Sequence, residues 1–217
     1  MQKQLKEFVD THGDVLRRDP WRERYDLPEV PDADILKDNE IKYIRVTTES
    51  VNAVRSFECQ TLDTARQNSL ALAHKRLLAQ VSAKPEGTEA ARCYGLDMQP
   101  LGGLIVGDRV QSVKIPDYSQ PYIAIHNHPS GLTFSPADIQ QFAERPNMQM
   151  LTAVGNNGKV YAIERGQRYS QAGLKALSNK FHKKVMKTKT KKEVFKAIDN
   201  FYKEVQQYGV YFYATGD

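Results

Sequence analysis

Cysteine is scarce in this chain. Cys59 and Cys93 are the only two among 217 residues, they lie far apart, and no CxxC pair occurs. This excludes the disulfide framework that stabilises many small secreted proteins. The cysteine-rich patterns that hold structural zinc are absent as well. We therefore expect reduced, buried thiols, with Cys93 a minor candidate for a zinc ligand because its predicted strand should lie near a histidine motif.

Long apolar runs are also missing. None approaches the length of a membrane span or of the apolar region of a signal peptide. The charged fraction of 26% is average, and 217 residues can form one full-sized domain with extensions. These features predict a soluble, cytoplasmic protein that does not contact membranes. The net charge of +5 is compatible with an acidic or nucleic-acid partner.

The most informative segment is IAIHNHPSGLTFSPAD, residues 123–138. Its first residues are apolar and β-branched, which favours a strand. His126 and His128 lie two residues apart near the end of that strand. Because alternate side chains of a strand share a face, the two imidazoles can hold one cation. Proline and glycine at 129–131 then predict a turn.

A helix start follows the turn. Ser135 suits the N-cap, Pro136 the first helical position and Asp138 the third, which directs the Asp138 carboxylate back toward the strand end. Two histidines and one carboxylate, with a fourth position left for water, are typical of catalytic zinc. The same donor set also suits iron or manganese.

Each part of this pattern has a simpler interpretation. Ser135 and Asp138 could form only a capping box, and His126 and His128 could be partly exposed turn residues. Their order along one strand, turn and helix favours a metal site. The other histidines lack such neighbours and are interpreted as ordinary surface or helix residues; they are His12, His74 and His182.

The pattern His126-x-His128-Pro followed by Ser135-x-x-Asp138 resembles the signature of JAMM (JAB/MPN+) zinc metalloproteases. The sequence Asn-His-Pro-Ser-Gly, residues 127–131, resembles that of the RadC-like bacterial and phage branch of that family. Nine residues separate His128 from Asp138, one fewer than is usual, and the difference falls in the loop. The motif covers about 16 residues, and a looser resemblance in the order of elements spans 85–165.

This resemblance implies an α/β fold of the JAMM/MPN type, similar to cytidine deaminases, with a mixed sheet and flanking helices. It implies one zinc ion per chain, held by His126, His128 and Asp138. The activity would be hydrolysis of a peptide or isopeptide bond by a metal-activated water. Ser135 would donate a hydrogen bond to the oxyanion that forms during the reaction.

The family also requires a glutamate that handles the proton of the water. Glu89 fits best, because it follows a predicted long helix and a Pro-Glu-Gly-Thr loop and precedes a predicted strand. It would act first as general base and then as general acid. Glu86, in an expected exposed turn, and Glu58, placed before the long helix, are the reserve candidates.

The sequence as a whole predicts three regions: an arm or linker over 1–38, a JAMM-like domain over 39–168 and a basic helical extension over 169–217. The expected elements are a strand over 41–47, a helix over 62–81, a strand over 90–98, hairpin arms over 102–107 and 109–115, a strand over 121–128, a helix from 136, hairpin arms over 150–154 and 159–163, helices over 170–184 and 189–207, and an edge strand or docked segment over 208–213.

A basic run marks the junction of the last two helices. It could contact phosphates without reading sequence, or it could be a solvated, lysine-rich connection. Its members are Lys183, Lys184, Lys187, Lys189, Lys191 and Lys192. Two functions therefore remain open: a zinc metallopeptidase of phage or mobile-element type, and a non-catalytic JAMM-like module that binds DNA or a protein partner.

Overall fold

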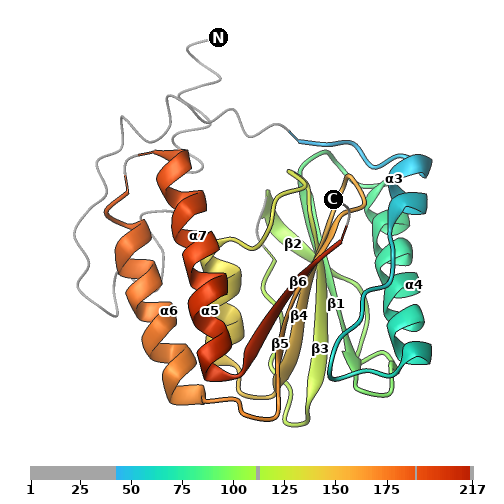
Figure 1. Ribbon diagram of the computed structural model, residues 1–217. Coiled ribbons are helices and arrows are strands. Elements are labelled where there is room, and N and C mark those ends of the chain that lie inside the picture. The colour runs from blue at the N-terminus through green and yellow to red at the C-terminus, as the bar shows by residue number, and fades with distance from the viewer. Residues whose placement is uncertain (1–42, 111–112, 189, 216–217) are drawn as a thin grey trace.

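The computed structural model describes residues 43–110, 113–188 and 190–215 (Figure 1). The arm predicted over 1–38 lies outside these ranges. The described elements are α3 (Thr48–Ala53), α4 (Thr64–Val81), β1 (Thr88–Gly95), β2 (Ile105–Val110), β3 (Tyr122–His128), α5 (Pro136–Glu144), β4 (Met148–Gly155), β5 (Val160–Arg165), α6 (Gln171–Val185), α7 (Lys191–Val205), a 3₁₀ turn (Gln206–Tyr208) and β6 (Val210–Ala214). They form a mixed α/β fold.

The six strands form one sheet in the order β2-β1-β3-β4-β5-β6. Among these neighbours only β3 and β4 run parallel. Parallel neighbours need a crossover connection, and α5 provides it. The carboxyl end of β3 and the amino end of α5 therefore meet at one end of the sheet.

Helices cover both faces of the sheet (Figure 1). On one face, α4 packs Leu77 and Leu78 against Ile123 and Ile125 of β3. On the other, α5, α6 and α7 share a core with Ala124 and the alternate strand residues. Of the described helices, none combines the length and the apolar character needed to cross a membrane.

Several predicted elements are confirmed. The long helix begins at Thr64, where the Asp63 side chain accepts a hydrogen bond from the Arg66 backbone as N-cap. The hairpin around Asn156-Asn-Gly is formed by β4 and β5, and Gly158 adopts the positive φ of +87° that favours glycine. Both C-terminal helices are present, and β6 is an edge strand paired with β5.

Two predictions were wrong. Residues 43–47 form no strand; instead Thr47 caps the short helix α3, which the alternating pattern did not suggest. Among the described residues of 102–115 the predicted hairpin is also absent, because the single strand β2 pairs with the preceding strand β1. The chain reverses earlier than expected, where the Met98 backbone N–H donates to the Gly95 carbonyl at 3.0 Å.

Candidate metal centre

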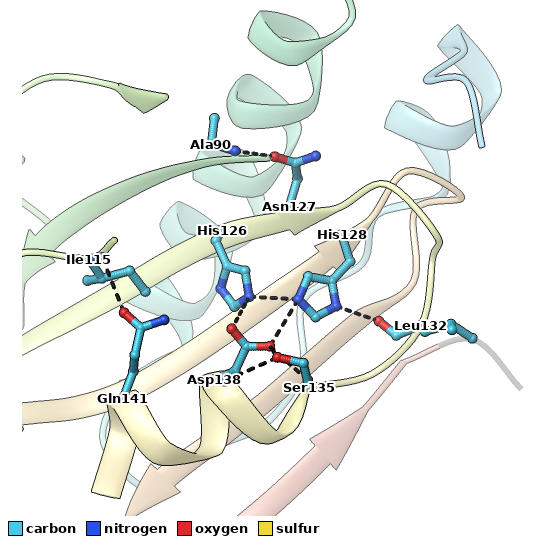
Figure 2. A network of polar contacts seen from close by, with 9 residues as sticks. All are labelled: Ala90, Ile115, His126, Asn127, His128, Leu132, Ser135, Asp138 and Gln141. Carbon is cyan, nitrogen blue, oxygen red and sulfur yellow. Dashed lines mark hydrogen bonds and ion pairs between the residues drawn. The ribbon is translucent and has the colours of Figure 1, made fainter. Parts of the chain in front are cut away.

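The two histidines of the motif lie on the α5 side of β3. Side chains alternate along this strand, so that Ala124 belongs to the core under α5 and Ile125 to the core under α4. His126 and His128 continue the Ala124 series, and both imidazoles point toward the first turn of α5 (Figure 2). All seven residues of β3 are buried, so the two histidines are held in the protein interior.

A capping box places the third donor. The Ser135 Oγ accepts from the Asp138 N–H at 3.2 Å, and the Asp138 Oδ2 accepts from the Ser135 N–H at 2.7 Å. Pro136 at the first helical position suits this geometry. The predicted capping box is therefore present, and the carboxylate that completes it also faces the histidines.

Donor atoms of three residues converge at this point. The distances are 2.8 Å between the Nε2 atoms of His126 and His128, 3.3 Å from His126 Nε2 to Asp138 Oδ1, and 3.3 Å from His128 Nε2 to Asp138 Oδ2. Ligand atoms about 2.0–2.1 Å from a tetrahedral zinc ion lie about 3.3 Å from one another. These residues therefore form a buried group that could hold a metal ion.

Contacts behind the donors orient them. The His128 Nδ1 lies 2.8 Å from the Leu132 carbonyl oxygen, which can only accept, so Nδ1 carries a proton and Nε2 is the ring nitrogen that faces the centre. The next residue, Thr133, exchanges a 2.7 Å hydrogen bond with the Tyr202 hydroxyl of α7. The C-terminal helices thus help to hold the loop that orients His128.

Ser135 is engaged with the carboxylate. Its hydroxyl lies 2.6 Å from Asp138 Oδ2 and donates to it, as a hydroxyl beside a carboxylate must. The single hydroxyl proton is therefore committed to Asp138 in this arrangement. Ser135 orients the Asp138 carboxylate, and it could serve an oxyanion only after rotating away from Asp138.

The three donors form a strongly coupled electrostatic group. Burial lowers the pKa of His126, and the Asp138 charge opposes this effect only in part. Burial acts in the same direction on His128, but its hydrogen bond to Asp138 and the Asp138 charge outweigh burial and raise the pKa of His128. Although burial acts to raise the pKa of Asp138, His126 and His128 hold that pKa well below its usual value. Asp138 is accordingly ionised and ready to bind a cation.

Glu89 lies on the neighbouring strand and on the same face as the donors. It is the second residue of β1, so it falls inside the strand that was predicted to begin just after it. Ala91 pairs with His126 in an antiparallel ladder, which places Glu89 beside His128. The Glu89 side chain is only 8% exposed. Burial raises the pKa of Glu89 to about 8, with the Asp138 charge adding to the rise and His128 opposing it.

Asn127, between the histidines, fixes the end of β1. Its Oδ1 accepts from the Ala90 N–H at 2.7 Å, and its Nδ2 donates to the Thr88 carbonyl at 3.0 Å. These two backbone groups flank Glu89. Sequence reasoning missed this residue, although the odd position between two strand histidines predicts a side chain on the other face. Asn127 therefore holds in place the backbone that carries Glu89.

The other candidates do not reach the centre. Glu58 and Glu86 are exposed, and Cys93 pairs with Ala124 deeper in the sheet. Burial raises the pKa of the Cys93 thiol to about 11, which keeps the thiol protonated at neutral pH. Among the described residues, the group that could hold a metal ion contains only the two motif histidines and Asp138.

His74 was interpreted as an ordinary surface or helix residue. It does lie on a helix, α4, but it is fully buried on the opposite face of the sheet, with its Nε2 at 2.7 Å from the Thr152 hydroxyl. Burial, aided by the His126 charge, lowers the pKa of His74 to about 3. His182 is half-buried on α6, and His12 lies outside the described residues.

No family model, no curated protein and no solved structure matches the chain.

Proposed function

We propose that this protein is a zinc-dependent metallopeptidase of the JAMM type, which hydrolyses a peptide or isopeptide bond. One observation carries the proposal: the buried convergence of His126, His128 and Asp138, with the buried carboxyl of Glu89 on the same face of the adjacent strand. A structural zinc site needs four protein ligands, whereas this group offers three and an acid beside them. The mixed α/β fold is compatible with the JAMM/MPN type.

The donor set suits the metal and the chemistry. When bound, zinc would lower the pKa of a coordinated water to about 7 and so supply hydroxide at neutral pH. The protein's own part begins with His126, His128 and Asp138, which the β3 face and the capping box hold ready to bind it. Little side-chain ordering is then needed on binding, because these residues are already fixed by packing and hydrogen bonds.

Glu89 is the proposed proton carrier. With its pKa near 8, this carboxyl can both hold and release a proton close to neutral pH. It would accept the proton from the attacking water and pass it to the leaving nitrogen as the C–N bond breaks. Asn127 supports this role by fixing Thr88 and Ala90 on either side.

Metal content of the purified protein tests the first half of the proposal. Elemental analysis should find about one zinc per chain, and a His126→Ala, His128→Ala double variant should lose it. His182→Ala is the matched control, because this half-buried α6 histidine lies outside the donor group and its loss should leave the metal bound. Absence of metal from the unmodified chain, even after zinc is offered, would refute the proposal.

Substrate screens test the second half. The zinc-loaded protein is incubated with a fluorogenic peptide library and with lysine-linked isopeptides, beside the double histidine variant. Hydrolysis by the first and not by the second supports the peptidase. Stoichiometric zinc without turnover of any substrate would favour the alternative, a non-catalytic JAMM-like module that binds DNA or a protein partner.

A further inference from the structure

Positive charge is concentrated in the last part of the chain. Residues 169–217 contain ten lysines and four acidic residues, a net charge of +6, so the preceding 168 residues carry −1 of the total of +5. The described lysines at the α6–α7 junction are all exposed and form no ion pair with a described residue; these junction lysines are Lys183, Lys184, Lys187 and Lys192. Lys189 lies outside the described residues.

The junction lies at the same end of the molecule as the metal centre. α6 runs antiparallel to α5: its first residue, Gln171, donates to the Ala143 carbonyl near the end of α5, and Ser178 donates to Gln140. The residues after Ser178 therefore extend toward the amino end of α5, which carries Asp138. Figure 1 shows the α6–α7 connection at the end of the sheet where β3 leads into α5.

Fold stability does not account for these lysines. Lys183 and Lys184, in the last turn of α6, do interact favourably with the helix dipole. Lys192, however, lies in the first turn of α7, where the dipole disfavours a cation. Like charges gathered at one junction also repel one another. By contrast, Lys180, one turn before Lys184 on α6, forms an ion pair with Glu204 at 2.8 Å.

The surroundings of the junction favour nucleic acid as the partner. A helix that lies on a membrane exposes apolar side chains, but the exposed large hydrophobic residues of the described chain are Leu72, Val106 and Leu132, outside both helices. The described aromatic side chains of α6 and α7 are at least partly buried, so they offer no open platform for stacking single-stranded bases. Neither helix contains arginine, which commonly reads bases.

We propose that the junction lysines bind the phosphate backbone of double-stranded nucleic acid, without sequence preference, at the end of the molecule that holds the metal centre. The closely spaced phosphates of a duplex match a cluster of exposed cations, and the release of condensed counterions drives such binding. The junction lysines form this binding surface without any contribution from a bound metal ion. Binding is therefore independent of the metal and of the proposed peptidase activity.

Fluorescence anisotropy of the full chain as purified, with a labelled 20-base-pair DNA duplex, tests this proposal, and EDTA added to the same protein should leave Kd unchanged. Two double variants are compared, Lys184→Gln with Lys192→Gln at the junction, and Lys175→Gln with Lys203→Gln at the other ends of the same helices. Each removes two exposed charges. The junction variant should raise Kd by about tenfold and flatten the plot of log K against log salt by about two units of slope. The control should stay within about twofold of the unmodified chain.

A second duplex of unrelated sequence should bind equally well. Equal losses in the two variants, or no duplex binding at low salt, would overturn the proposal. Displacement of the duplex by poly-glutamate as readily as by unlabelled duplex would instead indicate an acidic protein partner. Binding to anionic vesicles in preference to duplex would assign the surface to membranes.

Discussion

Each face of the sheet buries a histidine completely, but among the described residues only the α5 face brings histidines and a carboxylate together. His126 on the α5 face and His74 on the α4 face are both fully buried, and burial lowers the pKa of each. His126 has the Asp138 carboxylate 3.3 Å away, whereas within the described chain the hydrogen-bond partner of His74 is the Thr152 hydroxyl. Burial alone thus makes a histidine a neutral core residue, and a neighbouring carboxylate makes it a candidate ligand.

The largest effect should come from Glu89→Gln. This change keeps the shape of the side chain but removes the group that takes up the proton, so turnover should fall by about 10²–10⁴-fold. Zinc content, measured on the same preparation, should not change. His74→Gln is the control from the α4 face and should retain activity within a few-fold. Full activity of the Glu89 variant would show that another group carries the proton.

Metal should stabilise the protein through the α5 face alone. Free zinc at 1,000 times its Kd should add about 4 kcal/mol to the free energy of unfolding. The gain, measured by urea titration with zinc or with EDTA, should vanish in the His126→Ala, His128→Ala variant. It should persist in His74→Gln. A gain that disappears with His74 would mean that the two faces are not separate.

His74 should make the protein sensitive to acid. The pKa of His74 is about 3 in the folded chain and 6.5 ordinarily, so between these values the unfolded chain binds the extra proton. Stability therefore falls as the pH drops below 6.5, by about 2–3 kcal/mol at pH 4.5 from this residue. Urea midpoints in EDTA at pH 7.5 and 4.5 should show a smaller acid loss for His74→Gln. An unchanged loss would contradict a buried, neutral His74.

The smallest effect is expected from Tyr202→Phe. Loss of the hydroxyl frees Thr133 and loosens the loop whose Leu132 carbonyl orients His128. Zinc affinity, measured by competition with a chelating dye, should weaken by about tenfold while the thermal midpoint of the metal-free protein changes little. Tyr213→Phe is a comparison from another part of the sheet, where the hydroxyl contacts Glu164, and it should leave zinc affinity unchanged. Equal affinities for all three proteins would exclude coupling between α7 and the centre.

The difference between the two faces also explains what could be predicted from the sequence. His126, His128 and Asp138 lie within 13 consecutive residues, so strand, turn and cap rules suffice to bring them together. In the folded chain His74 contacts Thr152, which lies 78 residues away in the sequence, and no local sequence pattern predicts such a contact. The prediction of a hairpin over 102–115 was wrong for the same reason, because the partner of β2 is the earlier strand β1.

The prediction of Glu89 depended on more than the local sequence. Its assignment rested on the order of elements implied by the JAMM resemblance, and its position within β1 follows from the pairing of that strand with β3. The role of Asn127 is clear only once β1 and β3 are side by side, because its partners Ala90 and Thr88 lie 37 and 39 residues away. Long-range pairing is the part that local propensity cannot supply.

The short span of the three donors has a consequence for the order of folding. Closing the loop between β3 and the first turn of α5 fixes few residues and costs little entropy, so the donors can meet early. Glu89 arrives only when β1 pairs with β3, which closes a much longer stretch of chain. If the proposed function holds, a partly folded molecule could capture an ion before Glu89 is in place, and the bound ion would then act as a nucleus on which the remaining strands assemble.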